Sequence, residues 1–412
     1  MRYMANGMKV YHLPHLPILQ GDVAFLSFFS SLPLIREILI REHIDIVHGH
    51  QSTSVLQHCV MLAAKSYGLK TVFTEHSLFG FNDMSGINLN KLITWSFRDL
   101  DAAICVSHAC KDNFVLRAKY DPSKTFTIPN AVDSQKFTPD PSIREREIQK
   151  TGNPDQINIV FISRLQYRKG VDLLIGIIPK ILAQFENVHF IIGGDGTGMV
   201  HLQELVEKHN LHGRVELLGG LPHDKVRDVL CRGHIFLNTS LTESFCIAIL
   251  EAVCCGLLVV TTDVGGIPEV LPPHMAYLAK PEERSILRQL KTAVLSVKKI
   301  PTDTFYNQVA DIYSWRQVAE RTEKVYDYVM EEPIPNIMAR IKSSFSWGPV
   351  VGVFSLFFTI IEAIALCLTE KFLPESNIDI ARNFDSQTYK KQPTSYGNHE
   401  VYVNTLDPRH IH

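Results

Sequence analysis

Two glutamates separated by seven residues are the side chains whose spacing most clearly suggests ligand chemistry. Glu243 and Glu251 lie in the segment ESFCIAILE, which follows a predicted apolar strand at 234–240 and begins a predicted helix. The start of a helix offers unpaired backbone N–H groups and a partial positive charge, and both favour phosphate. One acid there and another two turns later can accept hydrogen bonds from sugar hydroxyls on either side of that phosphate. The spacing therefore suits a nucleotide-sugar, while a capping glutamate and a solvated helix face are the simpler alternative.

A pair of cations follows another predicted strand, at 157–164. Arg164 and Lys169 lie in the segment SRLQYRKG, where Gly170 allows a close approach of the backbone. Arginine binds a diphosphate through its planar fork and lysine binds it as a point charge, so the two residues suit that group. A solvated basic loop is the alternative interpretation.

Two glycine-rich segments also follow predicted strands. GGDGTG, which contains Gly194, lacks the β-α-β context and the ribose-binding acid about twenty residues later that a dinucleotide site requires. We interpret it as a tight turn near the ligand. VGGIPEV places Gly265 and Gly266 before Pro268 at a helix start, and a turn is favoured there over a second phosphate loop.

Three histidines lie at predicted strand ends of the first half, where a histidine can bind or polarise a substrate oxygen. His48 and His50 share one side of a strand, and His76 ends the next strand. No further ligands have the spacing of a zinc site, so we predict no metal. Asp99 and Asp101 resemble a metal-binding Asp-x-Asp, but they precede their strand and are interpreted as a helix stop.

The elements that must position these residues alternate between strand and helix. The predicted strands are 44–50, 70–76, 102–108, 125–130, 157–164, 188–196, 214–220, 234–240 and 257–262. The predicted helices are 32–43, 54–68, 89–99, 109–119, 171–185, 200–210, 223–230, 244–256 and 314–330. Strands separated by helices of this length imply parallel β-α-β units. The fold class is therefore α/β, with two Rossmann-like, doubly wound domains that bind ligands at the carboxyl ends of their strands.

The domain boundaries follow from composition. We predict an N-terminal domain at 1–137, a linker rich in Pro, Asp and charge at 138–155, a C-terminal nucleotide domain at 156–313 and a last soluble helix at 314–331. A chain of 412 residues suits two domains. The net charge of −2 and the lack of a basic stripe exclude a nucleic-acid partner. The eight cysteines lack paired spacing and are predicted to be buried, reduced thiols in a cytosolic compartment.

A 22-residue apolar segment, 347–368, is long enough to cross a bilayer and is followed by a polar tail at 369–412. Its one charge, Glu362, would cost about 3 kcal/mol at the bilayer centre. The alternative is a buried core helix, and the all-round apolar composition argues against it. The basic residues that flank the segment are equal in number on its two sides, so they do not indicate its orientation in the membrane. The lack of a signal segment and the sequon at Asn238, which would block the nucleotide site if glycosylated, favour a cytosolic catalytic domain.

The motifs SRLQYRKG, GGDG, HIFLNTS with TESFCIAILEA, and VGGIPEVL, in that order, resemble the retaining glycosyltransferases of family 4, which have the GT-B fold. TEHSLFGF, IPNAVDSQKFTPDP and SWRQVAERTEKVYD, followed by one span, are similar to the phosphatidylinositol glycan class A branch of that family. This resemblance implies transfer of N-acetylglucosamine from UDP-N-acetylglucosamine to phosphatidylinositol, with retained configuration, as the first step of GPI-anchor synthesis.

The resemblance also implies roles for particular residues. Arg164 and Lys169 would neutralise the leaving diphosphate, which removes the need for a metal or other cofactor. Glu251 would bind the ribose, and Glu243 and His76 would act at the donor sugar. The remaining implied contacts are Gly194, Phe245 and Cys246 for the donor, and His48 and His50 for the acceptor cleft. Many family members have glycine at the position of Cys246.

The resemblance further implies a single-pass protein of the endoplasmic reticulum membrane, with a cytosolic catalytic domain and other membrane subunits as partners. The family begins with a strand and a glycine-rich loop, and this sequence aligns only after that unit, so the N-terminal domain is expected to be incomplete. Two hypotheses follow: an active transferase subunit, or an inactive form that docks with the transferase complex. A nicotinamide-dependent enzyme is excluded by the weak GGDG context and the apolar span.

Overall fold

The computed structural model describes residues 2–4, 7–13, 24–79, 84–335, 337–344, 349–381, 389–392 and 401–404. The chain divides into two compact units. The central unit is Val72–Glu332, and the terminal unit combines Met1–Thr71 with Pro333–His412. The domain boundaries expected from the sequence stay a prediction.

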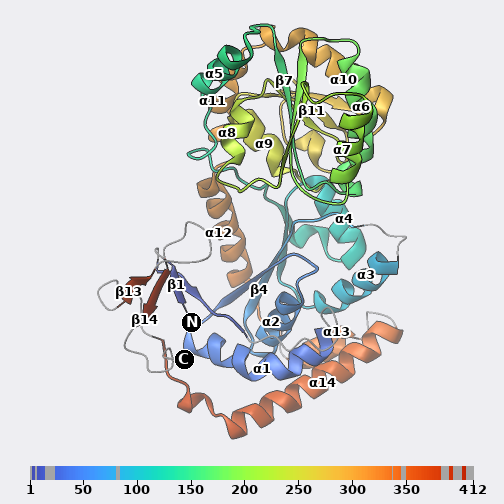
Figure 1. Cartoon of the computed structure of the whole chain (residues 1–412). Helices are drawn as coiled ribbons and strands as arrows, with labels where there is room; N and C mark the ends of the chain where they lie inside the picture. Colours follow the sequence, from blue (N-terminus) through green and yellow to red (C-terminus); the bar gives the residue numbers. More distant parts are fainter. Residues whose placement is uncertain are drawn as a thin grey trace. The chain divides into compact units, whose positions relative to one another are not determined.

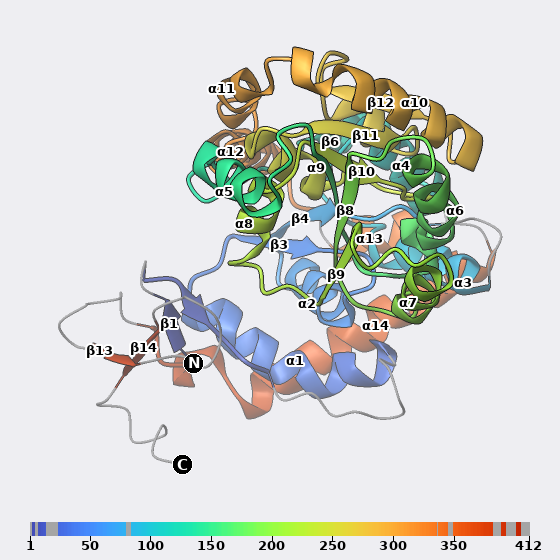
Figure 2. The same ribbon diagram turned by 45° about the horizontal axis from the view of Figure 1, so that its top comes forward.

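A six-stranded parallel sheet forms one half of the central unit (Figures 1 and 2). Its strands are β7 (Ile157–Ile162), β8 (Val188–Gly193), β9 (Val215–Gly219), β10 (Ile235–Asn238), β11 (Leu258–Thr262) and β12 (Ala276–Ala279). They lie side by side in the order β12-β11-β10-β7-β8-β9. The chain reverses direction across the sheet between β7 and β10, which is the doubly wound arrangement.

Helices cover both faces of this sheet, so its central strands are buried and mostly apolar. In Figure 2, α6 and α7 lie on one side and α8 and α9 on the other. All residues of β10 and β11 are buried, as expected for parallel strands between two helical layers. The helices of this half are α5 (Pro141–Thr151), α6 (Val171–Leu182), α7 (Met199–Lys208), α8 (Val226–Cys231), α9 (Ile247–Cys254), α10 (Glu283–Ser296) and α11 (Phe305–Ala310).

The predicted linker differs from the structure, because α5 occupies most of it. Asp140 accepts hydrogen bonds from the backbone N–H of Ser142 (3.1 Å) and from its hydroxyl (2.7 Å), and Pro141 takes the first helical position. This capping, together with helix-forming Glu, Arg and Lys residues, favours a helix despite the content of Pro, Asp and charge on which the linker prediction was based. Strand β12 and helix α10 were not predicted.

The other half of the central unit contains parallel strands β4 (Lys70–Glu75), β5 (Ala102–Cys105) and β6 (Thr125–Thr127), which pair in that order. Helices α3 (Met84–Ser96) and α4 (His108–Ala118) belong to it. The rings of Phe73, Phe97 and Phe114 form its core, with centroids 4.3–5.8 Å apart. Helix α12 (Trp315–Glu331) follows the six-stranded half in sequence, and its Tyr328 ring lies 5.4 Å from that of Phe126 in β6.

The terminal unit is helical apart from β3 and a small antiparallel sheet in the order β13-β14-β1-β2. Its helices are α1 (Ala24–Arg41), α2 (Val55–Ser66), α13 (Ile337–Ser344) and α14 (Pro349–Phe372). Its strands are β1 (Arg2–Met4), β2 (Lys9–Val10), β3 (Ile46–His50), β13 (Tyr389–Gln392) and β14 (Val401–Asn404).

Helix α14 contains the predicted membrane segment. Among the described residues it is the one helix long and apolar enough to cross a membrane, over Gly352–Phe372. The expectation that this segment is apolar all round was wrong for one face. Ser355, Thr359 and Glu362 are buried, and the Glu362 carboxylate accepts a hydrogen bond from Arg340 at 3.3 Å.

The opposite face of α14 is apolar and exposed, including Phe357, Ile361, Ile364 and Leu368. The predicted start at 347 lies outside the described residues. The helix continues beyond the predicted end at 368 to Phe372, so the predicted polar tail begins as helix. Within this helix, the charge of Glu362 is paired with Arg340 rather than left without a partner.

Candidate active site

The loops that follow β7 and β10 form the centre of the site, because these two strands are hydrogen-bonded neighbours. Ile235 pairs with Ile159 and Phe236 with Val160. Parallel neighbours end at the same edge of a sheet, so segments about seventy residues apart in sequence leave it side by side. This adjacency places Lys169, one of the two predicted diphosphate cations, next to Glu243, one of the two predicted acids.

Gly170 makes the approach of the two loops close. A Cβ at Gly170 would lie 1.8 Å from the carbonyl oxygen of Thr239, and its φ of +67° also favours glycine. The Thr239 hydroxyl lies 2.9 Å from the carbonyl oxygens of Lys169 and Gly170. The backbone N–H of Leu241 donates to the carbonyl of Arg168 at 2.9 Å. The two loops are thus held together by direct backbone contacts.

Lys169 and Glu243 form an ion pair across these loops. Their side chains are 24% and 13% exposed, so the pair is partly shielded from water and still open to a ligand. The structure therefore brings together one predicted diphosphate ligand and one predicted sugar ligand.

A buried polar network supports Glu243 from below. The Ser240 hydroxyl lies 2.9 Å from the Glu243 carboxylate and 2.8 Å from the side-chain oxygen of Asn238. Asn238 in turn donates to the hydroxyl of Thr261 at 2.9 Å. Asn238 and Ser240 are both buried, so the predicted sequon is part of the packed interior beneath the site.

Glu243 does not lie in the helix that was predicted to begin there. Helix α9 begins at Ile247, and Cys246 is its N-cap residue. Glu243 therefore stands in the preceding loop, and Glu251 lies in the second turn of α9. The chain turns into α9 through Cys246, whose φ of +73° is in the left-handed region. This conformation explains why glycine suits the position, since only glycine adopts it without a steric cost.

Glu251 is the second acid of the pair and is largely buried, with 17% of its side chain exposed. Burial raises the pKa of Glu251 to about 7, and nearby Lys136 acts in the opposite direction. His223 Nε2 lies 3.9 Å from the Glu251 carboxylate. A carboxyl group in this setting becomes a better hydrogen-bond acceptor when it ionises.

Arg164 and Gly194 lie together at the end of β7. Arg164 is exposed beside a loop that Gly194 packs against, since a Cβ at Gly194 would lie 1.8 Å from the Ser163 carbonyl oxygen. Gly194 has a φ of +135°, which favours glycine, and the predicted turn follows it, closed by a hydrogen bond from the backbone N–H of Met199 to the carbonyl of Gly196 at 3.1 Å. Its role and that of Arg164 toward a donor stay predictions.

Phe245 occupies a different place from the other predicted donor residues. It is 2% exposed, and its ring centroid lies 5.9 Å from that of Tyr313. The side chain therefore packs beneath the loop. Burial raises the pKa of the neighbouring Cys246 thiol to about 12, so this thiol stays protonated.

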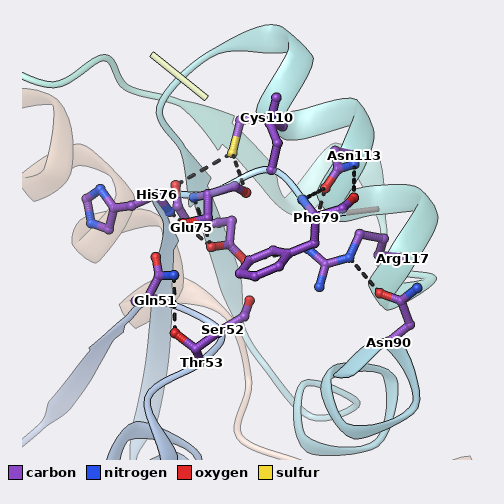
Figure 3. A network of polar contacts seen from close by, with 12 residues as sticks. Gln51, Ser52, Thr53, Glu75, His76, Phe79, Asn90, Cys110, Asn113 and Arg117 are labelled. Carbon is purple, nitrogen blue, oxygen red and sulfur yellow. Dashed lines mark hydrogen bonds and ion pairs between the residues drawn. The ribbon is translucent and has the colours of Figure 1, made fainter. Parts of the chain in front are cut away.

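His76 follows β4 in a loop that is held by a buried carboxylate (Figure 3). Glu75 is fully buried, and its Oε1 accepts hydrogen bonds from the backbone N–H groups of His76 (3.1 Å) and Ser77 (3.2 Å). Its other carboxylate oxygen lies 4.0 Å from Arg117 Nη1. Burial lowers the pKa of Arg117, an effect that Glu75 opposes.

One face of α4 holds the same loop through three side chains at helical spacing (Figure 3). Cys110 Sγ lies 3.6 Å from the carbonyl oxygen of Glu75. Asn113 donates to the carbonyl oxygen of Phe79 at 3.1 Å, and the Arg117 guanidinium lies 4.6 Å from the centre of the Phe79 ring. The position of α4 therefore determines the position of His76.

The loop of His76 meets the loop of Glu243. The Ser244 hydroxyl donates a hydrogen bond to the carbonyl oxygen of His76. The predicted catalytic residues His76 and Glu243 are thus brought to adjacent loops of the central unit. Their catalytic roles stay predictions.

His48 and His50 belong to the terminal unit. Their rings are stacked with centroids 4.4 Å apart and planes at 18°. Burial lowers the pKa of His50. Their assignment to an acceptor cleft stays a prediction.

The sequence analysis missed Glu75, Asn113, Arg117, Ser240 and Ser244. An acid that ends a strand after the four uncharged residues TVFT, as Glu75 does, is the one signal that indicated such a role. Within the described ranges, no group of three or more His, Cys, Asp or Glu side chains is arranged to hold a metal ion. Independence from metal stays a prediction.

Arg117→Met should destabilise the central unit, because it removes a cation beside the buried Glu75 carboxylate. We expect a loss of about 3–5 kcal/mol in the free energy of unfolding, measured by thermal or denaturant unfolding. Arg316→Met is the matched control, since Arg316 and Glu320 form an exposed pair on α12 and should contribute less than about 1 kcal/mol. Equal stability of the two variants would contradict this account of the buried pair.

Cys246→Gly should stabilise the protein by up to about 1 kcal/mol, because glycine adopts a positive φ without the steric cost of a Cβ. Asn210→Gly is the control, since Asn210 also has a positive φ (52°) but asparagine tolerates it well. The melting temperatures of the two variants check this. A lower melting temperature for Cys246→Gly than for the wild type would contradict this, because the packing of the thiol would then stabilise the protein by more than the backbone strain destabilises it.

Comparison with protein families agrees with this geometry. A family model described as PIGA (GPI anchor biosynthesis) matches residues 1–83, and one described as Glycosyl transferases group 1 matches residues 143–299. A glycosyltransferase from Rickettsia africae aligns with a TM-score of 0.64 at 18% identity, covering 77% of this chain and 86% of that one. Anabaena HepE in complex with UDP aligns with a TM-score of 0.62 at 21% identity, covering 72% and 82%. These similarities confirm the predicted GT-B fold.

Two relatives are similar over almost the whole chain. The phosphatidylinositol N-acetylglucosaminyltransferase gpi3 subunit of Schizosaccharomyces pombe is 45% identical over 392 residues, which are 95% of this chain and 84% of the relative. A phosphatidylinositol N-acetylglucosaminyltransferase subunit from Homo sapiens is 46% identical over 385 residues, which are 92% and 78%. Identity at this level and coverage shows common family membership. The chain therefore belongs to the family of these phosphatidylinositol N-acetylglucosaminyltransferase subunits.

Proposed function

We propose that this chain transfers N-acetylglucosamine from UDP-N-acetylglucosamine to phosphatidylinositol, the first step of GPI-anchor biosynthesis. The names of the relatives indicate the substrates, and the site contains side chains that suit their binding. The observation that carries the proposal is the partly shielded ion pair of Lys169 and Glu243 at the adjacent ends of β7 and β10. A fixed cation beside an acid matches a ligand in which a diphosphate is joined to a sugar.

In the proposed reaction, the bond between the anomeric carbon and the diphosphate oxygen breaks, and UDP leaves with the electron pair. Lys169 exchanges its carboxylate partner for the diphosphate, and exposed Arg164 adds a second positive charge. An inositol hydroxyl oxygen forms the new bond on the same face of the sugar. Its proton passes to the leaving diphosphate, so atoms and charges balance. These side-chain cations supply the charge neutralisation, and we propose that no metal is needed.

The remaining side chains bind and orient the donor. Glu251 would accept hydrogen bonds from the ribose hydroxyls, and Glu243, released from Lys169, would accept them from the sugar. The Ser240 hydroxyl, 2.9 Å from Glu243, can then donate its one hydrogen to the freed carboxylate. His76 would face the donor sugar and the acceptor from the opposite loop.

The membrane setting is proposed on similar grounds. Helix α14 would attach the chain to the endoplasmic reticulum membrane in a single pass, with the catalytic domain on the cytosolic side. Both relatives are named as subunits of a transferase. We therefore propose that other membrane proteins assemble with this chain.

Lys169→Ala should lower transfer, as kcat/KM, by about 10²–10³-fold, because it removes a charge that is needed most when UDP leaves. The assay uses microsomes with labelled UDP-N-acetylglucosamine and phosphatidylinositol. Lys180→Ala is the matched control, because Lys180, on α6, forms a partly exposed ion pair with Glu283, the first residue of α10. Normal transfer by Lys169→Ala would refute the donor site, and a wild-type chain that assembles but transfers no sugar would identify an inactive docking subunit.

Affinity for UDP-N-acetylglucosamine, whose diphosphate is esterified at both ends and has no group that titrates near neutral pH, should increase as the pH rises through about 7. The raised pKa means that Glu251 is mostly protonated below that pH, and only its ionised form accepts hydrogen bonds from both ribose hydroxyls. Binding below pH 7 must therefore release a proton, and the dissociation constant should rise by up to about tenfold per pH unit of acidification. Calorimetry at several pH values measures this. Glu251→Gln cannot ionise, so it should bind the nucleotide weakly and without this pH dependence. A wild-type affinity that is equally independent of pH would contradict the assignment.

A further inference from the structure

Several polar links join the half of the central unit that carries His76 to the half that carries Glu243, among them a hydrogen bond from Arg168 to the carbonyl oxygen of Leu78 at 3.4 Å. Two shorter links involve Ser244 and Glu269. One is the hydrogen bond from the Ser244 hydroxyl to the carbonyl oxygen of His76. The other connects Glu269, in the turn after β11, to the first turn of α4. Neither Ser244 nor Glu269 belongs to the residues proposed to contact the donor or acceptor.

The carboxylate of Glu269 caps α4 with both of its oxygens. It accepts hydrogen bonds from the backbone N–H of His108 (2.7 Å) and of Ala109 (2.9 Å). The next N–H, of Cys110, donates to the Ser107 hydroxyl at 3.0 Å. The first N–H groups of α4 are therefore all satisfied, two of them by a residue about 160 positions later in the chain. An acid at this end of a helix also gains from the helix dipole.

The glycines beside Glu269 keep this contact close. A Cβ at Gly265 would lie 2.0 Å from the carbonyl oxygen of Glu243. A Cβ at Gly266 would lie 2.0 Å from the carbonyl oxygen of Ser244 and 2.5 Å from the Ser107 hydroxyl. The segment VGGIPEV, interpreted from the sequence as a turn, thus fills the space between the donor loop and the start of α4.

The capped helix is the same one that holds the His76 loop. Cys110, Asn113 and Arg117 of α4 contact the segment from Glu75 to Phe79, as Figure 3 shows. A shift of α4 must move that segment, because these contacts leave it little freedom. Glu269 therefore acts on His76 through α4, and Ser244 acts on it directly.

We infer that Ser244 and Glu269 are positioning residues that hold His76 in register with Glu243 and the donor. This inference rests on the proposed function, since it assigns the two residues to the same reaction. Transfer needs His76 and the donor sugar at a fixed separation, and a displacement of about 1 Å can cost about 10²-fold in rate. Binding of UDP involves only the six-stranded half, so it does not need either link.

The first test separates binding from turnover. Ser244→Ala and Glu269→Gln should each lower kcat by about three- to tenfold, with KM for UDP-N-acetylglucosamine and the calorimetric affinity for UDP within about twofold of wild type. Glu282→Gln is the control, because Glu282 stands at the start of α10 without a side-chain capping bond and should leave kcat unchanged. Unchanged kcat in both site variants would overturn the inference. Parallel losses of kcat and UDP affinity would also overturn it, because the residues would then act by folding the donor site.

Hydrogen exchange gives a readout that does not depend on transfer. In Glu269→Ala, amides in the first turn of α4 and in the segment from His76 to Phe79 should exchange about tenfold faster than in wild type. Faster exchange in α4 alone would mean that Glu269 is only a cap, which would overturn the positioning role. If the wild type bound UDP and transferred no sugar, the proposed function would fail, and the exchange result would still decide whether Glu269 controls the His76 loop.

Discussion

The pairing of β7 with β10 is the constraint on which the site depends. These strands are hydrogen-bonded neighbours although their loops are about seventy residues apart in sequence, and the meeting of Lys169 with Glu243 follows from that adjacency. A doubly wound sheet leaves a gap where its chain direction reverses, and here Lys169 and Glu243 meet across it. Gly170 is required because the loops approach to backbone contact. The order of the strands in the sheet thus brings the two loops together, and the side chains of Lys169 and Glu243 then form the ion pair.

The second half of the central unit contributes through a helix rather than through its strands. Helix α4 holds the His76 loop with three side chains and receives the Glu269 carboxylate at its first turn. A single rigid element therefore links a strand-end loop of one sheet to a turn of the other. This arrangement suits a reaction in which the leaving group and the attacking hydroxyl approach from different halves, because alignment is set before the substrates meet.

Much of this was accessible from the sequence, and the limits have physical causes. Strand ends carry ligands in parallel sheets, so the location of Lys169 and Glu243 at one edge of a sheet could be predicted from apolar runs followed by charges, while their roles toward a donor stay predictions. Arg117 could not, because it meets Glu75 only after two strands and two helices have packed, and spacing does not reveal such a pair. The conformation of Cys246 was hidden for the opposite reason: a cysteine there gives no hint of a positive φ that glycine would have signalled. In α14, the helical spacing of Ser355, Thr359 and Glu362 places these polar residues on one face. The high mean hydropathy of the segment directed attention away from that face.

The position of Asn238 has a bearing on how this protein is placed relative to a bilayer. The acceptor amide of the sequon Asn238-Thr239-Ser240 lies inside the sheet and is bonded to Thr261, with the serine fully covered. An oligosaccharide-transferring enzyme needs an extended, accessible acceptor, which a completed β10 does not offer. Once the sheet has formed, this asparagine stays unmodified in the lumen and in the cytosol alike. In the folded protein, the burial of Asn238 in β10 alone is therefore enough to keep this sequon from being modified.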